Sequence, residues 1–167
     1  MVSFKSTFDK KYLSDGLKAH IKVKLKLFKY VPFIGVGYLI FLVLISLLGN
    51  EVFSMSVSEI IITIMLILFP FIFYYTNSLN FKNNSLFGKE LTWEVNTESI
   101  KGFNDKLNFI VNWKDILEVF RLKNGLIIYK SKNNYYWFPN DDFDKESSVD
   151  DIVGFIKTNN IKYSIKK

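Results

Sequence analysis

Two uncharged apolar runs dominate the pattern of the chain. The first covers residues 30–50 and the second covers residues 60–81, and neither contains Asp, Glu, Lys, Arg or His. Each run is about 20 residues long, the length that a helix needs to cross about 30 Å of hydrocarbon. Neither run shows the alternation of a half-buried strand or the polar face of a surface helix. The pattern predicts two transmembrane helices, at about 30–49 and 60–80, and a helical hairpin buried in a soluble core is the alternative.

The charges beside these runs indicate an orientation. The short connection between the runs contains Glu51 and Glu59 but no Lys or Arg, whereas lysines precede the first run and follow the second. The positive-inside rule then places both termini in the cytoplasm and the connecting loop outside. Because no ionisable residue lies within either run, the spans are not expected to form a proton relay or an ion pathway. Residues 30–81 are therefore predicted to be a membrane anchor.

Residues 1–29 are strongly basic and lead directly into the first run. Residues 1–30 contain eight lysines against two aspartates. Apolar residues recur at helical spacing between residues 14 and 30, although residues 21–27 also alternate as in a strand; we favour a helix. Such a cytosolic, basic amphipathic helix would rest on anionic headgroups, at about 1 kcal/mol per lysine. The candidate membrane-surface residues are Lys18, Lys22, Lys24, Lys26 and Lys29.

Two further expectations concern this basic segment. The alternative to lipid contact is that the lysines only fix the membrane topology, and the same charges are able to do both. The single histidine of the chain, His20, lies in the segment and is expected to face solvent without a special role.

After residue 82 the pattern changes to short segments rich in Val, Ile, Phe, Tyr and Trp, separated by turn signals. The clearest hairpin signal is the Asn124-Gly125 pair. A helix is predicted over residues 146–162, after the last of these segments. Strands are predicted at residues 91–96, 99–103, 106–111, 116–122, 125–131 and 134–138. The fold class is therefore a membrane helical hairpin plus an α+β domain at residues 82–167. An antiparallel sheet closed by a C-terminal helix is the layout of pleckstrin-homology-like domains.

Composition excludes several kinds of chemistry. The chain has no cysteine and one histidine, so it has no material for disulfides, Cys-based zinc sites or thiol nucleophiles, and almost none for a His-based metal site or a Ser-His-Asp triad. The basic excess does not indicate nucleic acid, because residues 82–167 are nearly neutral, with fourteen Lys and Arg against twelve acids. We expect no enzymatic activity, no metal and no cofactor.

The segment YYWFPNDDFD, residues 135–144, is the one stretch that resembles a site. Its acids, Asp141 and Asp142 among them, suggest a calcium loop or an acid/base pair, but the spacing lacks the glycine and the twelfth-position glutamate of a calcium loop. We therefore expect a strand end followed by a polar turn. Tyr135 and Tyr136 should point to opposite faces of the strand, which would leave one of them exposed. The candidate partner-binding residues are Tyr135, Tyr136, Asp141 and Asp142.

Several motifs in this half of the chain occur together in one known family. They are WKDI at residues 113–116, the hairpin LIIYKSKNNYYWFP at residues 126–139, Phe143 and the final helix. With the two apolar runs, they resemble the YcxB-like family of bacterial membrane proteins. The resemblance implies a cytosolic pleckstrin-homology-like domain on a two-helix anchor in the bacterial inner membrane, and the family has no defined biochemical activity. In the usual pattern Lys-Arg follows the strand-ending proline, whereas here Pro139 is followed by Asn140-Asp141-Asp142.

Two hypotheses of function follow. The first is a non-enzymatic, two-pass inner-membrane protein that acts as a protein-interaction module, for example an immunity protein against a membrane-active bacterial toxin. The alternative is a regulator that senses membrane lipid or the cell envelope through its basic juxtamembrane helix. The expected partners are the lipid bilayer, a toxin or another membrane protein, or a second copy of the chain, and no nucleic acid.

Overall fold

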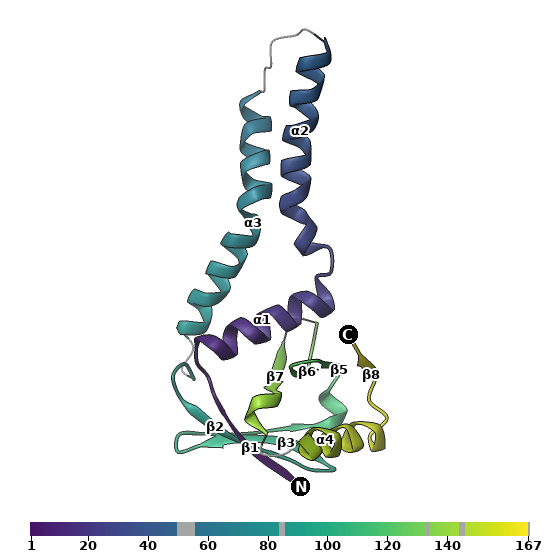
Figure 1. Cartoon of the computed structure of the whole chain (residues 1–167). Helices are drawn as coiled ribbons and strands as arrows, with labels where there is room; N and C mark the ends of the chain where they lie inside the picture. Colours follow the sequence, from purple (N-terminus) through teal and green to yellow (C-terminus); the bar gives the residue numbers. More distant parts are fainter. Residues whose placement is uncertain (50–55, 84–85, 133, 144–145, 167) are drawn as a thin grey trace. The chain divides into compact units, whose positions relative to one another are not determined.

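The chain folds as two units, which differ in composition and in secondary structure (Figure 1). The computed structural model describes residues 1–49, 56–83, 86–132, 134–143 and 146–166. One unit, the sheet unit, joins Met1–Val23 to Asn83–Lys167, and the other, the hairpin unit, is Lys24–Lys82. The sheet unit is thus assembled from both sides of the hairpin in the sequence.

The hairpin unit contains the two predicted spans. After the short 3-10 turn η1 (Phe28–Tyr30), helix α2 covers Val31–Gly49 and helix α3 covers Val57–Lys82. The apolar stretches of α2 and α3 have mean hydropathies of 2.6 and 2.3, and only 6% of the residues in each are buried. Both helices are therefore long and apolar enough to cross a membrane. A helix in a soluble core would bury most of these side chains, so their exposure favours the membrane prediction over the soluble alternative.

The sheet unit contains two four-stranded sheets. In the first, β1 (Val2–Thr7), β2 (Glu90–Val95), β3 (Ser99–Asn104) and β4 (Leu107–Asn112) are antiparallel and neighbours in that order. The second has the order β7-β6-β5-β8 and contains β5 (Glu118–Leu122), β6 (Gly125–Tyr129), β7 (Tyr135–Pro139) and β8 (Tyr163–Ile165). Strand β8 is parallel to β5, whereas the other pairs are antiparallel. The remaining elements are α1 (Lys10–Lys24), α4 (Glu146–Thr158) and the 3-10 turns η2 (Trp113–Asp115) and η3 (Asn140–Asp142).

The predicted α+β class is confirmed, and the details differ in two places. All six predicted strands are present, with ends within two residues of β2–β7. The final helix begins where predicted but ends at Thr158, and a further strand, β8, follows it. There are two sheets rather than one. The pleckstrin-homology-like identity of this layout stays a prediction.

Aromatic side chains fill the space between the two sheets. The Phe138 ring on β7 lies 4.9 Å, centroid to centroid, from both the Phe4 ring on β1 and the Trp93 ring on β2. Ile152 and Ile156 of α4 are fully buried as well. One face of the second sheet therefore belongs to a core shared with the first sheet. Burial of this kind stabilises a fold by roughly 1.5–3 kcal/mol per large apolar side chain.

Helix α1 covers the opposite face of the second sheet. Its Ala19 and Val23 form one buried cluster with residues from β5, β6 and β7, namely Phe120, Leu122, Ile127, Tyr129 and Trp137. A Cβ atom on Gly16 would lie 3.2 Å from Trp137 Cβ, so the absence of a side chain at residue 16 permits this close approach. The apolar face of α1 is thus used for packing within the sheet unit.

This arrangement corrects the interpretation of residues 1–29 as one separate segment. Residues 2–7 form an edge strand whose residues alternate between buried and exposed, and the helix begins only at Lys10. Residues 1–23 also belong to the sheet unit rather than to a segment of their own. The physical reason is that β1 and α1 both have apolar faces that the rest of the sheet unit buries.

Candidate functional site

The acidic turn after β7 is tied to the rest of the sheet unit. As predicted, the strand ends at Pro139 and the acids follow in a turn, η3. The Asn140 backbone N–H donates a hydrogen bond to the Asn124 carbonyl at 2.8 Å, and the Asn140 side chain donates one to the Lys123 carbonyl at 2.9 Å. These bonds fasten η3 to the turn between β5 and β6.

Asp141 and Asp142 both contact the N-terminal part of the chain. Asp141 forms an exposed ion pair with Lys11 at 2.9 Å, and the Ser6 hydroxyl donates a hydrogen bond to the Asp142 carboxylate. Burial raises the pKa of Asp142, and the Ser6 hydrogen bond opposes that shift. Within the described residues, no group of three or more His, Cys, Asp or Glu side chains is placed to hold a metal ion. The two aspartates join β7 to β1 and α1, and their role with a partner stays a prediction.

Tyr135 and Tyr136 face opposite sides of β7, as predicted, but neither is fully exposed. The Tyr135 ring lies under α1 and stacks on His20 with centroids 4.9 Å apart. The Tyr136 ring faces the first sheet, 5.6 Å from Trp93 and 6.2 Å from Phe109. Burial raises the pKa of Tyr135 to about 12 and also raises the pKa of Tyr136. The expectation that one of the two tyrosines is exposed is wrong, because both are half-buried against neighbouring elements. Their role with a partner stays a prediction.

The expectation that His20 faces solvent is also wrong. Its side chain is buried beneath α1, with Nδ1 2.9 Å from the Tyr129 hydroxyl and its ring stacked on Tyr135. His20 lies beside Ala19 on the face of α1 that packs on the sheet, and this position explains the burial. Desolvation raises the pKa of the Tyr129 hydroxyl.

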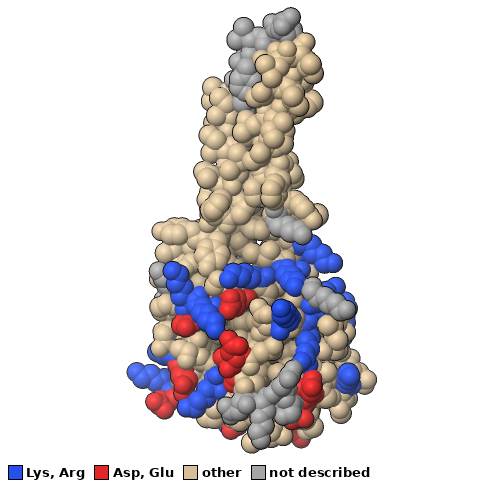
Figure 2. All heavy atoms as spheres, viewed as in Figure 1, with Lys and Arg blue, Asp and Glu red and all other residues tan. Residues whose placement is uncertain are grey.

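The five candidate membrane-surface lysines do not lie on one element. Lys18 and Lys22 are exposed on α1. Lys24 is the last residue of α1 and Lys26 follows it, and both belong to the hairpin unit. The Lys29 side chain lies outside the described part of the structure. Figure 2 shows Lys and Arg gathered among fewer acids on this face of the sheet unit, and no charged side chain on the same face of the described parts of α2 and α3. The lysines of α1 therefore have to be considered together with other residues of the sheet unit.

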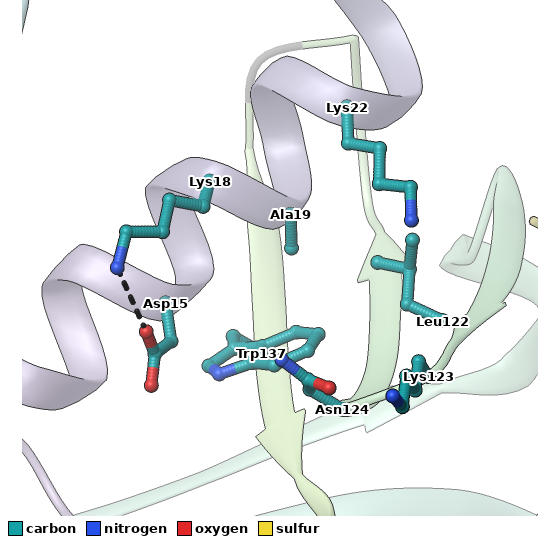
Figure 3. Close-up of a pocket in the computed structure, with 8 residues that line it drawn as sticks. All are labelled: Asp15, Lys18, Ala19, Lys22, Leu122, Lys123, Asn124 and Trp137. Atoms are coloured by element: carbon teal, nitrogen blue, oxygen red, sulfur yellow. Dashed lines mark hydrogen bonds and ion pairs between the residues drawn. The ribbon is translucent and has the colours of Figure 1, made fainter. Parts of the chain in front are cut away.

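An open pocket of about 220 Å³ lies between α1, the β5–β6 turn and β7 (Figure 3). We call it the lysine pocket. Six of its lining residues carry polar groups: Asp15, Lys18, Lys22, Lys123, Asn124 and Trp137. Lys18 and Asp15 form an ion pair at 3.4 Å. The Trp137 side chain is 3% exposed, and its indole Nε1 has no hydrogen-bond partner in the described structure.

Sequence reasoning missed three residues of this pocket. Asn124 was recognised only as part of a hairpin signal, and Lys123 and Trp137 were not recognised as site residues. Nothing local indicates that these residues meet Lys18 and Lys22, more than 100 positions earlier in the chain. The one local signal of α1 docking is the glycine at residue 16.

Comparison with known proteins finds similarity to one family. Residues 100–156, from β3 to α4, match the family described as YcxB-like protein. Over 115 residues the chain is 25% identical to "Uncharacterized protein YcxB" of Bacillus subtilis (strain 168). The aligned part covers 66% of this chain and 62% of that protein. The matched part is thus less than two thirds of the relative's length. No solved structure matches the chain. The resemblance predicted from the motifs at residues 113–143 is therefore confirmed, and residues 100–156 carry the sequence pattern of the YcxB-like family.

Proposed function

We propose that this chain is a two-pass membrane protein whose sheet unit is a non-enzymatic binding module on the cytoplasmic side. The observation that carries the proposal is the pairing of β1 with β2 across the hairpin. These strands pair along their full length, from Val2 with Val95 to Thr7 with Glu90. Because paired strands have to lie on the same side of a bilayer, the chain between them has to cross it an even number of times.

The side of the membrane follows from charge. Lysines flank the hairpin at its two ends, and positively charged flanks favour the cytoplasm. The proposal also retains the bacterial cytoplasmic (inner) membrane as the site of the protein, since the relative comes from a bacterium, Bacillus subtilis.

The absence of cysteine makes this topology directly testable. Single cysteines would be introduced as Lys10→Cys, Ser56→Cys and Lys157→Cys, all at exposed positions. With a membrane-impermeant maleimide on intact cells, we expect labelling at residue 56 only, and labelling at residues 10 and 157 only after permeabilisation. Labelling of residues 10 and 157 from opposite sides would contradict the proposal, because the sheet unit would then be split by the bilayer.

The first candidate partner of the module is a protein, and the exposed edge of the first sheet supports it. Strand β4 is an edge strand, and its Ile110 side chain is 61% exposed. Edge strands present unpaired backbone groups that a partner strand is able to extend, with side-chain contacts adding specificity. Ile165 on β8 has a similar exposed fraction, 66%, and provides a matched control.

Affinity purification of the full-length protein in mild detergent tests this candidate. We expect one stoichiometric protein to be recovered with the parent chain and with Ile165→Lys, and to be lost with Ile110→Lys. Recovery of the chain without a stoichiometric partner would count against a protein partner. An immunity protein against a membrane-active toxin is one version of this module, and no feature of the described residues or of the relative favours it over other partners.

Lipid is the second candidate partner, and the exposed lysines of α1 favour it. Because the apolar face of α1 is buried on the sheet, lipid contact would be electrostatic rather than by insertion of that face. Amide hydrogen exchange of residues 10–24 would then be slower in anionic nanodiscs than in phosphatidylcholine nanodiscs, and the Lys18→Gln/Lys22→Gln variant would lose the difference. Equal exchange in both lipids would contradict this candidate.

A further inference from the structure

The lysine pocket combines positive charge from two distant parts of the chain. Lys18 and Lys22 come from α1, and Lys123 comes from the turn between β5 and β6. Against these three lysines the pocket contains one acid, Asp15, which already pairs with Lys18. Within the described residues, Lys22 and Lys123 form no ion pair. The pocket therefore has a net positive charge that its own residues do not neutralise.

The size of the pocket limits what it is able to hold. Its volume of about 220 Å³ is below the roughly 300–1,000 Å³ that is usual for sites of drug-sized ligands. One phosphate with a short alcohol fits within this volume, whereas a nucleotide or a multiply phosphorylated inositol would extend out of the open side of the pocket. Lysine ammonium groups bind phosphate as point charges and donate up to three hydrogen bonds each.

Trp137 forms one wall of the pocket and provides a reporter for its contents. The side chain lines the pocket, is 3% exposed, and leaves its indole N–H without a partner in the described structure. Buried indole N–H groups usually have an acceptor. By contrast, Trp113 donates its indole N–H to the Asn96 carbonyl at 2.8 Å, whereas the core residue Trp93 leaves its indole N–H unpartnered as Trp137 does. The Trp137 nitrogen lies on the Asp15 side of the ring, away from Lys22 and Lys123 (Figure 3), so the residue forms a wall of the pocket and the lysines carry the argument for an anion.

We propose that the lysine pocket binds the phosphate of a small phosphomonoester, with Lys22 and Lys123 supplying the charge and Asn124 a further polar contact. The same chemistry occurs in a soluble sugar or glycerol phosphate and in the headgroup of phosphatidic acid. This inference goes beyond the binding-module proposal, because it rests on the pocket alone and holds whether or not the module has a protein partner.

The test uses the full-length protein in phosphatidylcholine nanodiscs, with its tryptophan indole N–H signals observed by NMR. sn-Glycerol 3-phosphate is titrated at constant ionic strength, and Trp137→Phe assigns the Trp137 signal. We expect a saturable shift of the Trp137 signal and none of the Trp113 signal, whose indole N–H is hydrogen-bonded elsewhere. A second arm replaces the soluble probe with nanodiscs that contain phosphatidic acid. A shift in this arm identifies a lipid headgroup as a source, and a shift with the soluble probe alone identifies a soluble phosphate.

Matched variants separate the pocket from overall charge. Lys22→Gln/Lys123→Gln removes two charges from the pocket, and Lys130→Gln/Lys157→Gln removes two exposed charges elsewhere in the sheet unit. Loss of two charge-assisted contacts should weaken binding by at least about tenfold in the first variant, with little change in the second. Lys22→Arg should retain binding, since the charge remains.

Four outcomes would overturn the proposal. They are equal weakening in both double variants, the same Trp137 shift with sodium chloride at equal ionic strength, a shift only when an acidic peptide is titrated in place of sn-glycerol 3-phosphate, and no shift in either the soluble or the lipid arm. The first two would reduce the effect to diffuse electrostatics. Near-UV circular dichroism of each variant shows that the tryptophan packing is intact, so that a loss of binding is not a loss of folding.

Discussion

One substitution tests whether α1 docks on β7. A docked helix and a free helix predict changes of opposite sign in the free energy of unfolding. Leucine in place of glycine inside a free helix stabilises it by about 0.8 kcal/mol. At residue 16, however, a Cβ atom would lie 3.2 Å from Trp137 Cβ and 3.3 Å from Trp137 Cγ, and leucine adds three more carbons beyond it. Overpacking of this kind costs about 1–3 kcal/mol or more. We expect Gly16→Leu to destabilise the sheet unit by roughly 1–2 kcal/mol, or about 5–10 °C in Tm.

The matched control is the same substitution in a helix that leaves room for it. Gly154 of α4 is exposed, and a Cβ atom there would meet no heavy atom within 4 Å. Gly154→Leu should therefore stabilise the unit by several tenths of a kcal/mol through helix propensity alone.

Tryptophan fluorescence is a suitable assay for both variants. All three tryptophans, Trp93, Trp113 and Trp137, lie in the sheet unit, so denaturant unfolding in detergent micelles, followed by their fluorescence, reports on that unit. If Gly16→Leu were stabilising to the same extent as Gly154→Leu, α1 would not pack on β7. The helix would then be free to rest on the membrane surface, as the sequence pattern alone suggested.

Three further substitutions test individual contacts. Burial raises the pKa of Asp142 above its ordinary value of 3.8, so the stabilising contribution of Asp142 is complete below that value and is lost as pH rises through the raised pKa. Asp142→Asn should therefore be more stable than the parent at neutral pH and equal to it in acid. Urea unfolding that showed no pH-dependent difference between the two would contradict this. Gly125→Ala places a Cβ atom 2.2 Å from the Phe138 carbonyl oxygen. The free energy of unfolding should therefore fall by about 3 kcal/mol, or the variant should fail to fold. A urea midpoint equal to that of the parent would show that β6 and β7 lie farther apart at this position than in the structure. Tyr129→Phe removes the buried contact with His20 Nδ1 and should cost about 1–2 kcal/mol in the same unfolding assay, whereas an unchanged free energy would show that the hydroxyl contributes nothing.

The parts of the fold that the sequence predicted are those with strong local signals. The two spans follow from uninterrupted apolar runs, and β2–β7 follow from short apolar segments between turn residues. Strand β1 was missed although residues 2–7 alternate between buried and exposed positions, because the basic charge after it suggested a membrane-surface helix. Strand β8 was missed because three residues give no usable periodicity.

The pocket could not be predicted, because its residues come together only through tertiary packing. The lysines of α1 are recognisable in the sequence as a basic helix, but their partners depend on which face of α1 docks and on what it covers. Those two facts are decided by Gly16, which permits close contact with Trp137, and by the buried His20. A polar residue such as His20 is misread as exposed whenever its hydrogen-bond partner, here Tyr129, is far away in sequence.

The position of the hairpin within the sheet unit links membrane topology to folding. β1 cannot pair with β2 until the whole hairpin has been made, since the two strands flank it in the sequence. Closing a flexible loop of about 80 residues costs roughly 4 kcal/mol beyond a constant term. A hairpin of two spans returns the chain to the side of the membrane from which it left, and so it replaces most of that flexible loop by a fixed connection. An even number of spans is thus a condition for pairing β1 with β2, so the long β1–β2 register excludes a single crossing, while the argument for a membrane rests on the hydropathy of α2 and α3.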